Sequence, residues 1–174
     1  MASTLTTPYD FAVELLELCH QAVSDTTGGA IARRYVSPGR PAYDCEQLTV
    51  AVWTLGEADT VVAGPMAAGK RHMSGRVNLV GFLITVLRDC VPVLNEEQSG
   101  PPDADKIQAS AKLVDQDVWA IWTYVYAEMR RGGLFGGRCE DLFMDGARAL
   151  ETEGTLAGFE VEIRANIPGI INAS

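Results

Sequence analysis

The segment best suited to chemistry is a glycine-rich stretch that ends in a lysine. Residues 64–70 (GPMAAGK) fit the first seven positions of a phosphate-binding loop. The eighth position should be Ser or Thr, whose hydroxyl holds Mg²⁺, and here it is Arg71. Such a loop should also open a helix, whereas Gly75 follows soon and a strand is expected from Val77. We therefore interpret the segment as a connecting loop with a basic tip.

The cysteines and histidines form no recognisable metal or nucleophile motif. The four cysteines lack the short spacing of zinc sites, and we expect most to be small buried residues: Cys19, Cys45, Cys90 and Cys139. Cys45 and Cys90 are expected at strand ends, where the sheet can bring them together, and a three-cysteine cluster stays open as an alternative. The two histidines, His20 and His72, lie in no Ser or Cys nucleophile motif.

Carboxylates are plentiful, so an acid–base site built from residues distant in sequence stays open as an alternative. Asp115 and Asp117 are two residues apart on an expected helix and do not face each other. We expect a solvated acidic surface there. The sequence thus predicts no catalytic residues, no cofactor and no metal.

The composition indicates one folded domain, residues 1–174, with an acidic surface. The chain is 47% hydrophobic and 21% charged, and its formal net charge is −9. Such a surface repels phosphate backbones, so direct nucleic-acid binding is disfavoured, although an acidic channel wall would let DNA pass. We find no apolar run near the ~20 residues of a membrane helix and no signal-peptide features, and expect a cytosolic product with reduced cysteines.

Hydrophobic periodicity places two helices and several strands along the chain. Residues 8–23 have helical spacing, residues 31–36 suit a short strand, and residues 45–55 alternate as a strand does. Residues 77–91 are apolar on both faces, which indicates a central strand. A long helix then runs to Gly132. Its expected buried stripe is Ile107, Ala111, Val114, Val118, Ile121, Val125 and Met129.

The C-terminal part is expected to return to strands. Asp145-Gly146 is a strong turn pair and predicts a hairpin between residues 139–144 and 147–151. Residues 159–167 alternate strictly, with Glu160 and Glu162 outward, and Pro168-Gly169 should end that strand. The expected fold is α+β: a mostly antiparallel mixed sheet, with the N-terminal helix and the long central helix packed on one face.

Four short segments resemble small virion proteins of long-tailed phages that infect actinobacteria. They are residues 41–50 (PAYDCEQLTV), 87–92 (LRDCVP), 113–119 (LVDQDVW) and 154–161 (GTLAGFEV). The type most similar is the tail terminator, and the resemblance extends from about Tyr35 onward. It implies a small fold with helices against a sheet, no catalytic residues, and a hexameric ring that caps the tail tube and lets DNA pass.

From this resemblance we expect a virion protein at the head–tail junction, made in the host cytoplasm. Its partners would be copies of itself, the tail tube protein and the head–tail connector or stopper, with DNA only as a neighbour in the lumen and no membrane. The basic loop should face an acidic partner, the tryptophans the sheet or a neighbouring subunit, and the glutamates a lumen or solvent. These candidate contacts are Lys70, Arg71, His72, Arg76, Trp119, Trp122, Glu160 and Glu162.

Three alternatives remain. The first is another head–tail connector or tail-tube component. The second is a small nucleotide- or metal-dependent enzyme that uses residues 64–70, which predicts that ATP or GTP binds and that Lys70→Ala abolishes binding. The third is an interaction domain unrelated to virions, which predicts a monomer at any concentration.

Overall fold

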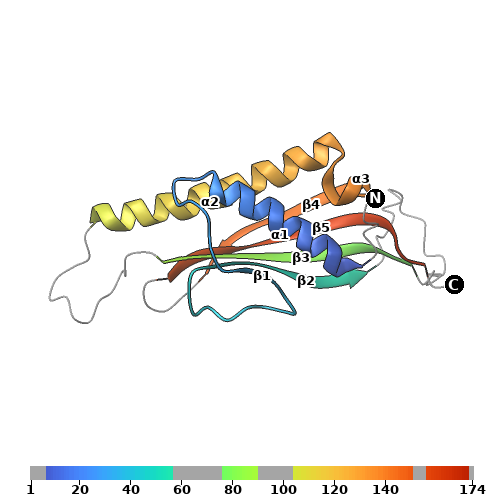
Figure 1. Ribbon diagram of the computed structural model, residues 1–174, viewed down its shortest axis with the longest axis horizontal. Helices are drawn as coiled ribbons and strands as arrows, with labels where there is room; N and C mark the ends of the chain where they lie inside the picture. Colours follow the sequence, from blue (N-terminus) through green and yellow to red (C-terminus); the bar gives the residue numbers. More distant parts are fainter. Residues whose placement is uncertain (1–6, 57–75, 90–103, 151–155, 173–174) are drawn as a thin grey trace, which may run out of the picture.

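The computed structural model describes residues 7–56, 76–89, 104–150 and 156–172, which form a five-stranded sheet with helices on one face (Figure 1). The elements are α1 (Pro8–Ser24), β1 (Arg34–Ser37), β2 (Gln47–Gly56), β3 (Arg76–Asp89), α2 (Ala104–Arg131), α3 (Leu134–Gly137), β4 (Asp141–Ala149) and β5 (Leu156–Asn172). The fold is α+β, as predicted. None of the described helices is both long and apolar enough to cross a membrane.

The sheet is mixed but mostly antiparallel. Its strand order is β1-β2-β3-β5-β4, and the pairing of β1 with β2 is parallel, whereas the other three pairings are antiparallel. Strand β3 lies in the middle, and its residues from Val80 to Arg88 are all buried. This confirms the prediction of a central strand, because a strand apolar on both faces needs cover on both.

Helix α1 forms where its local sequence predicts it. Thr7 and Asp10 make a reciprocal capping box, and Pro8 occupies the first turn, where a missing N–H costs nothing. Phe11 and its helical neighbours face the core. The Phe135 ring of α3 lies 5.2 Å from the Phe11 ring and 5.5 Å from that of Phe82 on β3, so the aromatic contact joins the helices to the sheet.

Helix α2 contacts the core with its C-terminal half. Its fully buried residues are Asp117, Ile121 and Val125. Ala111 is exposed and Ile107 is half-buried, so the expected buried stripe is wrong for the N-terminal half. The reason is geometric, because that half extends past the end of α1 and has no helix beside it there (Figure 1).

The second face of the sheet is covered in part by the connection between β1 and β2, residues 38–46. This connection passes on the side of the sheet opposite the helices (Figure 1). Pro41 within it is buried, and Thr49 and Thr85 on the strands beneath are fully buried. The sheet therefore lies between a helical layer and a loop layer.

The predicted hairpin around Asp145-Gly146 is wrong. Strand β4 runs straight through this pair, with Met144 opposite Ile163 and Ala147 opposite Val161 on β5. Two residues therefore lie opposite one, which is a β-bulge. Gly146 has φ +109°, a conformation that a glycine adopts as readily in a bulge as in a turn.

The predicted end of β5 at Pro168-Gly169 is also wrong. The pairing of β3 with β5 shifts register between Val77 and Leu79, and β5 then continues to Asn172. Proline has no N–H for a regular ladder, so an irregularity is where a strand can hold it.

Gly158 on β5 lies close against the backbone of β3. A Cβ at this position would lie 2.0 Å from the Val86 carbonyl oxygen, which is part of a central strand and cannot move aside. We expect Gly158→Ala to lower the free energy of unfolding by roughly 3 kcal/mol in urea titrations. Gly39→Ala is the control, because no atom lies within 4 Å of its Cβ position. Equal unfolding midpoints for the two variants would contradict this packing.

Candidate functional site

Three of the four basic residues predicted to contact a partner lie outside the described part of the chain. Lys70, Arg71 and His72 lie outside the described residues, as do the phosphate-loop-like segment at 64–70 and Cys90. Arg76 is the first residue of β3.

The two tryptophans on α2 differ in exposure. Trp119 is 70% exposed, whereas Trp122 is half-buried. Asp117 and Ile121 are buried two residues before and after Trp119, and a two-residue step turns about 200° around a helix. Trp119 therefore points away from the core, which rules out packing against the sheet of its own chain.

Glu160 is not the outward residue that alternation predicted. It lies on the sheet face opposite the helices but is only 1% exposed, because the 38–46 connection covers it. Arg40 Nε lies 3.0 Å from its Oε1, Tyr43 donates its hydroxyl to Oε1 at 2.6 Å, and Arg148 Nε donates to Oε2 at 2.9 Å. Glu162 on the same face is half-buried.

This cluster shifts the pKa of its members. Burial alone raises the pKa of the Glu160 carboxyl, but hydrogen bonds from Tyr43 and Arg148, with the charges of Arg148 and Arg40, outweigh it and hold the pKa below its usual value of 4.5. Burial and the hydrogen bond to Glu160 raise the pKa of Tyr43 to about 12. The carboxylate is therefore ionised and the phenol protonated at neutral pH.

A cavity of about 340 Å³ opens beside this cluster. We call it the sheet-face hollow, and it is lined by Arg40, Trp53, Leu83, Asp145, Gly146, Ala147, Arg148, Glu160 and Glu162. The Arg40 guanidinium lies 5.5 Å from the centre of the Trp53 ring, which is a cation–π distance. The hollow thus combines an aromatic ring and the apolar Leu83 with two arginines and three carboxylates.

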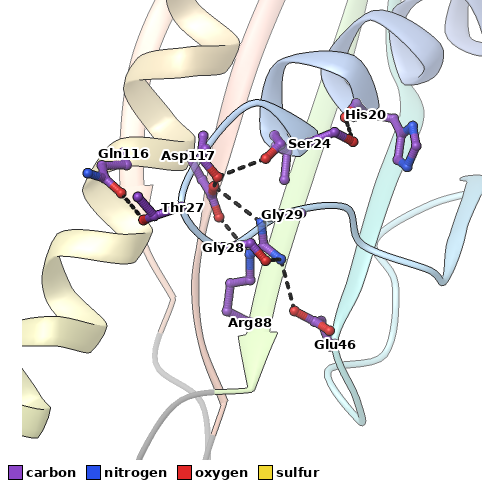
Figure 2. Close-up of polar contacts among 11 residues, drawn as sticks. His20, Ser24, Thr27, Gly28, Gly29, Glu46, Arg88, Gln116 and Asp117 are labelled. Atoms are coloured by element: carbon purple, nitrogen blue, oxygen red, sulfur yellow. Dashed lines mark hydrogen bonds and ion pairs between the residues drawn. The ribbon is translucent and has the colours of Figure 1, made fainter.

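The strongest polar cluster on the helix side centres on Arg88 (Figure 2). Its side chain is 2% exposed, and its Nε donates to Asp117 Oδ2 at 2.8 Å. The other N–H groups donate to the carbonyls of Gly28 and Gly29, to Glu46 and to the second oxygen of Asp117. All five donors of the guanidinium are therefore satisfied.

The burial of Asp117 corrects the expectation of a solvated acidic surface at Asp115 and Asp117. It is 0% exposed, and besides Arg88 it accepts a hydrogen bond from the Thr26 hydroxyl at 2.7 Å. Burial alone lowers the pKa of Arg88, but the hydrogen bond and charge of Asp117 outweigh it and raise the pKa above its usual value. The pair joins β3, α2 and the turn after α1, which is a structural role.

A second groove of about 440 Å³ lies between α1 and α2. It is lined by Glu14, Glu17, Leu18, His20, Gln21 and Glu128. Burial raises the pKa of Glu14, whose carboxylate accepts the backbone N–H of Phe135. Within the described ranges no group of His, Cys, Asp and Glu side chains is arranged to hold a metal ion.

The described cysteines are free thiols. Burial raises the pKa of Cys19, and burial with two nearby carboxylates raises that of Cys139 to about 11. Both therefore stay protonated at neutral pH and are poor nucleophiles.

The sequence matches no protein-family model, and no curated protein is significantly similar to it.

The Arg88–Asp117 pair yields a stability prediction. Asp117→Ala leaves a buried guanidinium without its main partner, and we expect a loss of about 3–5 kcal/mol in the free energy of unfolding. The double variant Arg88→Met/Asp117→Leu should recover most of this loss, because an apolar pair needs no charge partner. Asp115→Ala, an exposed position on the same helix, should stay within about 0.5 kcal/mol of wild type. Equal losses for Asp117→Ala and Asp115→Ala would refute the role.

Glu160 yields a pH prediction. Because its pKa is depressed in the folded state, its charge contributes stability above pH 4.5 that is lost as the pH falls through the folded pKa. We expect Glu160→Gln to be about 1.5–3 kcal/mol less stable than wild type at neutral pH, and the difference to shrink in acid. Urea titrations across pH measure it, with Glu162→Gln as the control on the same strand face. A pH-independent difference would sink the assignment.

Proposed function

We propose that the protein is a structural subunit of a phage virion, and specifically the tail terminator, which forms a ring at the head end of the tail tube. The observation that carries the proposal is the exposure of large apolar side chains on a well-packed core. These side chains are Tyr9, Val13, Trp53, Leu55, Trp119, Tyr126 and Phe143. Trp and Tyr side chains dominate the energetics of protein interfaces, so exposed aromatic side chains of this size suit contact with a partner.

The two edges of the sheet are poorly suited to open-ended strand pairing with another chain. Contacts with a partner are therefore expected to be made through side chains. Strands β1 and β4 are the outermost strands, and β1 has only four residues. Strand β4 is longer but carries a bulge and charged residues, among them Asp141 and Asp145. Short, bulged or charged edges are how proteins avoid uncontrolled pairing. A subunit protected in this way suits a ring that closes after a fixed number of copies.

The overall charge suits a channel through which DNA passes. The net charge of −9 repels the phosphate backbone, so DNA would slide along such a wall without adhering. In this proposal the tail tube protein and the head–tail connector or stopper bind the two rims of the ring. In the tail terminators that the chain resembles, the ring has six copies.

Negative-stain imaging of the purified protein, alone and with isolated tails that lack it, tests this proposal. We expect closed rings in a concentration series, or density that caps one end of each tail. Long tubes would instead identify a tail-tube subunit. Featureless monomers that never associate with tails would rule out both roles.

A further inference from the structure

The sheet face beneath the 38–46 connection carries a buried polar layer. Directly opposite positions on neighbouring strands share a face, and the register places one row of polar side chains across all five strands: Tyr35, Thr49, Thr85, Glu160 and Arg148. The three in the middle of the row are each 1% exposed or less. The face of the same strands toward the helices instead contributes apolar side chains to the core.

Two of these buried groups lack the partner that burial requires. The hydroxyl oxygens of Thr49 and Thr85 are hydrogen-bonded neither to each other nor to any other group in the described part of the chain. The carboxylate of Glu160, next in the row, is already engaged by Arg40, Tyr43 and Arg148. A hydroxyl buried without a hydrogen bond destabilises a fold, and for this reason the large majority of buried hydroxyls in native proteins have a partner.

The placement of the two hydroxyls suits one shared partner. Thr49 on β2 and Thr85 on β3 are directly opposite in an antiparallel pairing, which puts their Cβ atoms about 4.5–5.5 Å apart. A water molecule makes hydrogen bonds of about 2.8 Å to hydroxyls, so one water spans two hydroxyl oxygens up to about 5.5 Å apart. Each Thr hydroxyl both donates and accepts, so one water between them satisfies both.

Polar groups flank the two hydroxyls along the layer. On one side, Glu160 is directly opposite Thr85 and also lines the sheet-face hollow, which gives water a route to the layer. On the other side, Gln47 is buried, and its amide donates to the carbonyl of Ala42 and accepts from the Tyr35 hydroxyl at 3.2 Å. Internal water persists in polar surroundings of this kind, whereas apolar cavities stay dry.

We propose that an internal water molecule bridges the hydroxyls of Thr49 and Thr85 beneath the 38–46 connection. The ligand is neutral, because two hydroxyls bring no charge and the charge of Glu160 is already balanced by Arg40 and Arg148. The water links β2 to β3 on the polar face of the sheet and belongs to the folded structure. This inference goes beyond the proposed function and does not depend on it.

Oxygen-17 magnetic relaxation dispersion tests the site, because it counts the water molecules that stay inside a protein for longer than its tumbling time. The double variant Thr49→Val/Thr85→Val keeps the side-chain shape and removes both hydroxyls. We expect it to hold one long-lived water fewer than wild type. Thr49→Ser/Thr85→Ser keeps both hydroxyls and should hold as many as wild type. Equal counts for wild type and the valine double variant would overturn the proposal.

Urea titrations of the valine variants separate a bridging water from two unsatisfied hydroxyls. With the bridge, each single variant should lower the unfolding midpoint, because the water and the remaining hydroxyl lose a partner. The second substitution should then lower it by less than the first, since the two sites share one ligand. Thr54→Val removes an exposed hydroxyl from β2 and should leave the midpoint unchanged. Midpoints that rise additively in the two single variants would mean dry, unpaired hydroxyls and would overturn the proposal.

A high-resolution crystal structure separates the bridge from a direct bond between the hydroxyls. We expect density for one water within hydrogen-bond distance of both Oγ1 atoms. Hydroxyls in direct contact, with no water between them, would show the same coupling in urea but would refute the water site.

Discussion

The buried ion pair between Arg88 and Asp117 is the constraint on which the arrangement of the layers depends. A guanidinium removed from water destabilises a fold unless its donors are satisfied, and here two carboxylates and two backbone carbonyls satisfy all five. Those acceptors come from α2, from Glu46 just before β2 and from the turn after α1. A Cβ at Gly28 in that turn would lie 2.5 Å from Leu113 Cδ1 and 2.9 Å from Arg88 Nη2, so a side chain there would press on the hydrogen-bonded guanidinium. Fixing Asp117 inward also turns Trp119 outward.

A second charged cluster, around Glu160, holds the loop layer against the other face of the sheet. Glu160 ties the 38–46 connection to β5 and β4 through Arg40, Tyr43 and Arg148, and the sheet-face hollow forms beside it. One cluster therefore turns Trp119 outward, and the other shapes the hollow.

Periodicity was enough to predict most of the elements but not the polar contacts between them. The helix at residues 8–23, the strand at 45–55 and the alternation of 159–167 all follow from where apolar side chains recur. Alternation placed Glu160 on the correct face, but its partner Arg40 is 120 residues away, and Asp117 is 29 residues from Arg88. Nothing local in a sequence encodes such pairings. The hairpin predicted at Asp145-Gly146 was wrong for a different reason, because one backbone conformation of glycine suits both a turn and a bulge.

Native mass spectrometry of the purified full-length chain over a range of concentrations tests the central claim most directly, because it counts the copies in each assembly. The account predicts one closed stoichiometry, six copies if the family resemblance holds, that persists as concentration rises. An unlimited ladder of sizes would contradict a ring-forming subunit, as would a chain that remains monomeric throughout and never caps tails.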